Sequence, residues 1–139
     1  MFRKLNLAIV ILAALPCVAQ KVRVGTFDRA SLLVAYYKNS NPYFRKEMEA
    51  LTGAEKKGAG FQELAHQQLS GEAPIDNILE ALRPALAEVA HTARVDLIAG
   101  QIVYQGVGVE TVDITGALVE RFNPDEKTRE MIRSLRAGH

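Results

Sequence analysis

The feature that most constrains the fold is an apolar stripe of helical spacing in the second half of the chain. Its members recur every three or four residues: Ile75, Ile78, Leu79, Leu82, Leu86, Val89 and Ala93. Apolar residues at this spacing share one face of a helix, which has to be buried. Pro84 falls inside the pattern and predicts a kink. The stripe therefore predicts a long amphipathic helix that packs on another part of the protein.

A second, weaker amphipathic pattern lies before this helix. It begins at Asn41-Pro42, a good helix start, and continues with Phe44, Met48 and Leu51 at four-then-three spacing. The segment 70–74, SGEAP, separates the two patterns and is the clearest break in the chain. Two helices on either side of such a turn predict an antiparallel helical hairpin.

Glycines weaken the first arm of this hairpin. Gly53, Gly58 and Gly60 each cost a helix about 1 kcal/mol relative to Ala. We expect a helix to about residue 52, a loosened region, and a second helical piece over 61–69. A single frayed helix through all of this stretch is the alternative. With Gly100 ending the second arm, the hairpin spans about residues 42–99.

Short strand patterns lie on both sides of the hairpin. Residues 21–27, KVRVGTF, alternate like a half-buried strand, and Asp28 is placed to cap a helix over 30–37. Residues 101–104 and 109–112 form two more strand candidates around the glycines at 106 and 108, which predicts a β-hairpin. The predicted sheet and oligomer core comprises Val22, Val24, Ile102, Tyr104 and Ile114.

Two shorter helices close the chain. Asp113 or Thr115 can cap the first, and Asn123-Pro124-Asp125-Glu126 is a strong start for the second. The predicted fold class is therefore α+β: a small antiparallel β body, a helical hairpin that either protrudes or folds back, and C-terminal helices.

The first 19 residues have the layout of a secretory signal peptide. Arg3 and Lys4 precede an apolar run over 7–15, and small residues lead to a cut between Ala19 and Gln20. The run is too short to span a bilayer, which takes about 20 residues. A lipidated Cys17 is the alternative, disfavoured by the proline immediately before it. We expect cleavage, a single domain over 20–139, and a location in the periplasm or outside the cell.

Removal of this segment changes the composition. Two of the 17 basic residues and the one cysteine lie in it, so the rest of the chain carries 15 basic and 16 acidic residues and no thiol. This balance argues against a strongly basic nucleic-acid binder, and the absence of thiols excludes disulfides and cysteine nucleophiles.

No local pattern indicates catalysis. His66, His91 and His139 lie in no metal-binding motif, no serine lies in a G-x-S-x-G elbow, and Gly106-Val107-Gly108 lacks the rest of a phosphate loop. We expect no enzyme, no cofactor and no metal. A small hydrolase would need a cluster of polar residues that the sequence does not present.

Both ends of the predicted domain resemble the periplasmic chaperone family known as Skp or OmpH. Residues 21–37, KVRVGTFDRASLLVAYY, are similar to its first strand and helix. Residues 101–122, QIVYQGVGVETVDITGALVERF, are similar to its closing strand with a tyrosine and its Asp-Ile-Thr motif. The hairpin between them fits by architecture only, it is shorter than the family's long basic arms, and the tail over 123–139 extends beyond the family's usual end.

The resemblance implies a β body that forms a homo-oligomer, with a trimer as the family's state, and helical arms that enclose unfolded outer-membrane proteins. The predicted client and arm-packing surface comprises Phe44, Met48, Leu51, Phe61, Ile78, Leu82, Leu86 and Val89. The alternative is a secreted structural or protein-interaction module whose hairpin packs closed and has no client. We expect no nucleic-acid partner and no stable membrane span.

Overall fold

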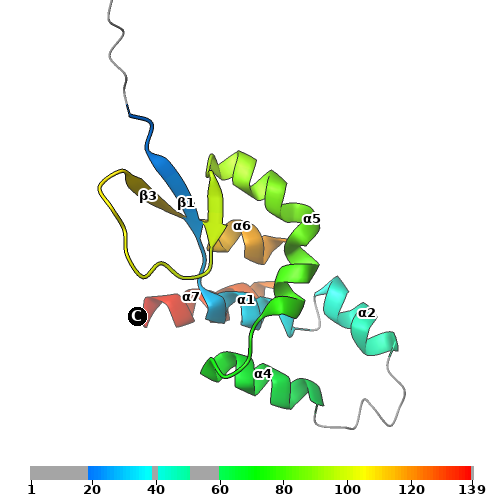
Figure 1. Cartoon of the computed structure of the whole chain (residues 1–139). Coiled ribbons are helices and arrows are strands. Elements are labelled where there is room, and N and C mark those ends of the chain that lie inside the picture. The colour runs from blue at the N-terminus through cyan, green and yellow to red at the C-terminus, as the bar shows by residue number, and fades with distance from the viewer. Residues whose placement is uncertain (1–18, 39–40, 51–59, 139) are drawn as a thin grey trace, which may run out of the picture.

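A three-stranded sheet forms the body of the protein, in a computed structural model that describes residues 19–38, 41–50 and 60–138. The strands are β1 (Val22–Thr26), β2 (Leu97–Ala99) and β3 (Val109–Asp113), in the order β2-β1-β3. Both pairings are parallel, with Val24 opposite Leu97 on one side and Thr111 on the other. Figure 1 shows β1 between its two neighbours.

The predicted antiparallel β body is therefore wrong. The chain over 100–108 passes from β2 at one edge of the sheet to β3 at the other, so these two strands do not pair with each other. Residues 101–104, predicted as a strand, form none; β2 lies just before them. The glycines at 106 and 108 do lie in a turn, but a turn signal fixes a change of direction and not the partner of each strand. β1 supplies backbone partners to both strands because it lies between them.

Six helices are described around this sheet. They are α1 (Arg29–Tyr36), α2 (Pro42–Ala50), α4 (Gly60–Ser70), α5 (Asp76–Ala93), α6 (Thr115–Glu120) and α7 (Glu126–Ala137). The predicted cap at Asp28 is confirmed, because its side chain accepts a hydrogen bond from the Ser31 amide at 2.8 Å. The predicted start of the last helix is also confirmed: the Asp125 carboxylate accepts from the Thr128 amide at 2.8 Å.

Helix α5 ends earlier than the predicted stop at Gly100. Arg94 takes a left-handed conformation, with φ 53° and ψ 49°, and the chain leaves the helix there. The next residues join the sheet at once, since the Asp96 amide donates to the Arg23 carbonyl at 2.8 Å. Pro84 lies inside the helix as predicted. The apolar residues after Arg94 therefore form β2 and do not extend the helix.

The core lies between the sheet and helices α1, α5 and α6. Three members of the α5 stripe, Ile78, Leu82 and Val89, are 0–2% exposed and belong to the same apolar cluster as Leu118 and Phe122. Helix α4 packs against α1, as Figure 1 shows. The predicted antiparallel hairpin does not form among the described residues: α4 and α5 each pack on the body, and they do not lie side by side.

Some predictions fall on residues that the structure does not describe. The signal segment through residue 18, with Cys17, and the stretch over 51–59, with Leu51, lie outside the described residues. Within the described part of the chain, none of the helices has the length and apolar character needed to cross a membrane.

Candidate functional site

One face of the sheet is covered by helices. Gly25 points to this side: a Cβ added there would lie 3.0 Å from Ile114 Cδ1 and 3.2 Å from Val95 Cγ2. The register partners of Gly25 are Ile98 and Val112, and both pack against the apolar core. Figure 1 shows the helices gathered on one side of the strands. The close packing on Gly25 therefore marks the inner face of the sheet.

The opposite face carries apolar side chains of its own. Successive residues of a strand point to opposite faces, so the neighbours of Gly25 along β1 and their register partners lie on this side. We define the open face by its apolar residues Val22, Val24, Leu97, Ala99 and Val109; the register also places Thr26, Thr111 and Asp113 on this side. Val24, in the central strand, is only 6% exposed. Val22 is 43% exposed and Leu97 is 47% exposed, although both are large apolar residues.

The chain between β2 and β3 adds further exposed apolar side chains. Val103, Tyr104 and Val107 are 93%, 86% and 102% exposed, and together they define the apolar loop. Its end before β3 is held by two hydrogen bonds: the Val22 amide donates to the Gly108 carbonyl at 2.9 Å, and Gln105 Nε2 donates to the Val109 carbonyl at 2.9 Å. These bonds hold the part of the loop that contains Val107 beside the strands.

Such a surface is unusual for a parallel sheet. Parallel sheets are nearly always covered on both faces, whereas antiparallel sheets tolerate one solvated face. In addition, β2 and β3 are both edge strands, and an edge strand offers unpaired backbone groups to another extended chain. The open face, the apolar loop and the two edges together have the chemistry of a protein-binding surface.

The predicted client surface on the hairpin does not form one open stripe. Ile78, Leu82 and Val89 are buried in the core. Leu86 and Phe44 are partly buried against that core. Phe61 extends the same aromatic packing, with its ring centroid 6.0 Å from that of Phe44, and Met48 is partly buried. The sequence grouped these residues by helical face, and the fold uses that face mainly for internal packing.

The predicted sheet residues are divided between two faces. Val22 is exposed on the open face and Tyr104 on the apolar loop; Val24 points to the open face but is buried there, Ile114 is buried on the helical side, and Ile102 is partly buried. Sequence reasoning missed Leu97, Val103 and Val107. Val103 lies in the predicted strand 101–104, and Val107 lies between the two turn glycines. Apolar residues this close to a glycine turn could have indicated an exposed apolar loop. Only the sheet order could place Leu97 on this face.

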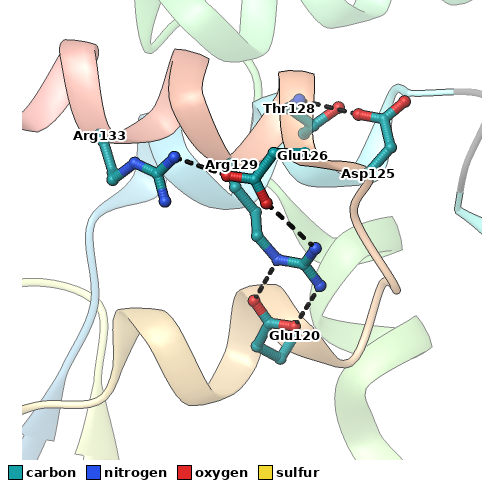
Figure 2. A network of polar contacts seen from close by, with 6 residues as sticks. All are labelled: Glu120, Asp125, Glu126, Thr128, Arg129 and Arg133. Atoms are coloured by element: carbon teal, nitrogen blue, oxygen red, sulfur yellow. Dashed lines mark hydrogen bonds and ion pairs between the residues drawn. The ribbon is translucent and has the colours of Figure 1, made fainter.

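Charged residues on α6 and α7 form a paired network. Arg129 donates to both carboxylate oxygens of Glu120, at 3.0 and 2.8 Å, and Glu126 lies 2.7 Å from Arg133, as Figure 2 shows. The hydrogen bond from Arg129 lowers the pKa of Glu120. Since each charge has a partner of opposite sign, this network holds the two helices together and offers no free catalytic acid or base.

A second polar network lies between α1, α4 and α5. Gln68 is 1% exposed; its Nε2 donates to the Pro74 carbonyl and to Asn77 Oδ1, both at 2.7 Å, and its Oε1 accepts from the Tyr37 hydroxyl at 2.8 Å. The Tyr36 hydroxyl donates to Glu47 at 2.7 Å. Burial, and then this hydrogen bond, raise the pKa of Tyr36. These hydroxyls therefore remain protonated structural donors.

No metal site is present in the described ranges, where no three side chains of His, Cys, Asp or Glu come together. Comparison with known proteins gives no relative: no family model matches the chain, and no curated protein or solved structure is similar to it. The open face and the apolar loop thus remain the best candidate for a functional site.

Proposed function

We propose that this protein is an exported, non-enzymatic protein-binding module that holds unfolded apolar segments of envelope or outer-membrane proteins. The proposal rests on one observation: a parallel sheet with helices on one face exposes Val22 and Leu97 on the other, beside the apolar loop. An unfolded segment is extended and partly apolar. It can pair with a sheet edge through its backbone while its side chains contact the loop.

The resemblance to the Skp/OmpH family supports the same function, and it changes which residues carry it. In the family the helical arms enclose the client. Here the stripe of Ile78, Leu82 and Val89 is buried, so we assign the client contacts to Val103, Tyr104 and Val107.

Self-association is part of the proposal. Val22 and Leu97 are exposed on the same sheet face, and covering them with copies of the same chain removes apolar surface from water. We propose a homo-oligomer, with the trimer implied by the resemblance, built on the open face and the strand edges. In this oligomer the apolar loop of each copy stays exposed at the edge of the interface and binds the unfolded segment.

A closed interaction module without a client is the second candidate. The burial of the α5 stripe favours it, because arms packed on the body cannot close around another chain. In this case, copies of the chain cover both the open face and the apolar loop, and nothing is left to bind an unfolded segment.

Two variants of equal charge change separate these candidates. The loop variant, Val103→Asp/Val107→Asp, places two carboxylates on the apolar loop. The control variant, Ala87→Asp/Thr92→Asp, places two on exposed positions of α5. The purified full-length chain and both variants are compared by light scattering and by their ability to suppress aggregation of a denatured outer-membrane protein.

The holding function predicts suppression by the unmodified chain and the control, and its loss in the loop variant. A closed module predicts an oligomer that suppresses nothing. A strict monomer at micromolar concentration contradicts self-association. Equal suppression by the loop variant and the control contradicts the assignment of the client contacts to the apolar loop.

A further inference from the structure

A cavity of about 570 Å³ lies on the helical side of the sheet, away from the open face. It opens where α5 faces the carboxyl ends of β1 and β2, and its apolar lining consists of Phe27, Ile75, Leu79, Leu86 and Ile98. Its volume is within the range of small-molecule sites, about 300–1,000 Å³. The carboxyl ends of neighbouring parallel strands are also the usual place for a ligand in an α/β sheet.

The apolar stripe of helix α5 is buried to different degrees across its width. One row, Ile78, Leu82 and Val89, is fully buried. A second row, with Leu79 and Leu86, is only partly buried and lines the cavity. Leu79 and Leu86 thus form the partly buried edge of the single apolar stripe, which packs against the core and also lines the cavity.

The cavity also contains a cation, Arg29, that has no anionic partner in the described part of the chain. Arg29 is partly buried and lines the cavity. Its Nε and Nη2 donate to the Gln68 carbonyl at 3.0 and 2.8 Å, and Nη2 also donates to the Ala73 carbonyl. Among the described residues, no carboxylate forms an ion pair with Arg29, and no hydrogen bond from Nη1 is present. The guanidinium is fixed in position while its charge is not neutralised.

The beginning of α1 does not offer a competing anion site. Its amides are capped by the Asp28 carboxylate, which accepts from the Ser31 amide at 2.8 Å and from the Ser31 hydroxyl. A negatively charged ligand would therefore meet Arg29 and not the helix end. Nε and Nη2 already donate to the Gln68 and Ala73 carbonyls, so a carboxylate would pair with the guanidinium through Nη1, in a charge-assisted hydrogen bond.

We propose that this cavity binds a single-chain amphiphile with a carboxylate head, of the fatty-acid class. The carboxylate pairs with Arg29, and the acyl chain lies along Leu79, Leu86 and Ile98. Arg29 and Gln101 are the polar side chains of the lining. A peptide would leave its backbone groups without partners there, whereas an acyl chain has none to satisfy. This site is separate from the apolar loop and does not depend on the proposed function.

Three probes with the same chain and different heads test the charge requirement. Isothermal titration of the purified full-length chain uses dodecanoate, dodecanol and dodecyltrimethylammonium below their micelle concentrations. We expect saturable binding of dodecanoate, binding of dodecanol weaker by roughly tenfold or more, and no binding of the cationic probe. Equal affinity for dodecanoate and dodecanol, or no saturable binding of dodecanoate, would overturn the proposal.

Variants then locate the ligand. Arg29→Gln should reduce dodecanoate affinity to that of dodecanol and leave dodecanol affinity unchanged, while Arg29→Lys should retain the preference for the anion. Leu79→Trp fills the cavity and should abolish binding of both. Arg83→Gln is the matched control, because Arg83 is an exposed arginine on α5 paired with Glu80.

The variants' fold is followed by circular dichroism, since Arg29 also bonds the turn after α4. If Arg29→Gln fails to fold, Arg29→Lys and Leu79→Trp still test whether dodecanoate binds in the cavity beside Arg29. Unchanged dodecanoate binding in Leu79→Trp overturns the proposal. So does loss of binding in Val103→Asp/Val107→Asp with retention in Leu79→Trp, because the probe then sits on the apolar loop.

Discussion

The backbone amide of Asp28 donates a hydrogen bond to the hydroxyl of Thr115 at 2.9 Å, across 87 residues of chain. Thr115 is the first residue of α6 and is 1% exposed. Its own amide donates to Asp113 Oδ1 at 2.9 Å. The junction after β1 and the junction after β3 are thus joined by a buried side chain.

Thr115→Val tests this link. Valine has nearly the same shape but cannot accept the hydrogen bond, so the Asp28 amide loses its partner in a buried place. We expect the free energy of unfolding to fall by about 1–3 kcal/mol. Thr115→Ser keeps the hydroxyl and is the control, expected to cost less. Urea denaturation measures both, and equal losses in the two variants would show that the methyl group, not the hydrogen bond, is responsible.

Gly25→Ala tests the close approach of the helical layer to β1. The new Cβ would lie 3.0 Å from Ile114 Cδ1 and 3.2 Å from Val95 Cγ2, so one of these side chains has to move. We expect a loss of about 1–3 kcal/mol in the free energy of unfolding. Gly116→Ala is the control: its Cβ meets nothing within 4 Å, and alanine in α6 should stabilise by about 0.5–1 kcal/mol. A lower melting temperature for Gly25→Ala and a higher one for Gly116→Ala would support the packing described for this face.

Leu82→Ala tests whether α5 is part of the core. Leu82 is fully buried, and removing its side chain leaves a cavity, which should cost about 2–5 kcal/mol in the free energy of unfolding. Ala87→Gly is the control, on the exposed side of the same helix. It changes only the helix propensity, so its expected cost in the free energy of unfolding is about 1 kcal/mol. A cost for Leu82→Ala no larger than for the control would mean that the arm stands free of the body.

The ion pair between Glu120 and Arg129 makes part of the stability depend on pH. The hydrogen bond from Arg129 holds the pKa of Glu120 below its ordinary value of 4.5. Because the pKa is lower in the folded state than in the unfolded state, the pair contributes stability that is fully present above the unfolded-state pKa. This contribution is lost as the pH falls through the folded-state pKa. Glu120→Gln should therefore reduce the loss of stability on acidification from about pH 5 downwards.

Glu130→Gln is the control for that experiment. Glu130 lies on the exposed side of α7 and has no ion pair among the described residues. Denaturation curves at a series of pH values give the slope of the unfolding free energy for each protein. The same slope for Glu120→Gln and the unmodified chain would contradict a stabilising role for the pair.

The sequence was reliable where the signal is local. Asp28 and Asp125 were placed as helix caps because a short acidic side chain can reach an amide three residues on, whatever the rest of the fold does. The helical piece over 61–69 and the start of α5 after Pro74 were predicted for the same reason. Each of these depends on spacing within a few residues.

The candidate site was predicted only in part, because its members come from distant segments. Val22 and Tyr104 were assigned to the sheet and oligomer core, and both are exposed on the surface now proposed to bind protein. The sequence did not indicate a functional role for Leu97 or Arg29. Leu97 was predicted to lie in the helix that ends at Gly100, and Arg29 in the turn after the first strand. Their roles depend on which segments lie beside them.

By itself, the sequence determined the approximate positions of the helices, the caps at Asp28 and Asp125 and the apolar stripe that had to be buried, because these follow from periodicity and local hydrogen bonds. The predicted cap of α6 at Asp113 or Thr115 is wrong, since Ile114 occupies that position. The tertiary structure decided the rest. It placed β1 between two parallel partners, so residues around the glycines at 106 and 108 became an exposed loop instead of a β-hairpin. It also folded the α5 stripe onto the body. Strand order and helix docking depend on contacts between distant segments, and the spacing of residues along one chain does not indicate which segments will pack together.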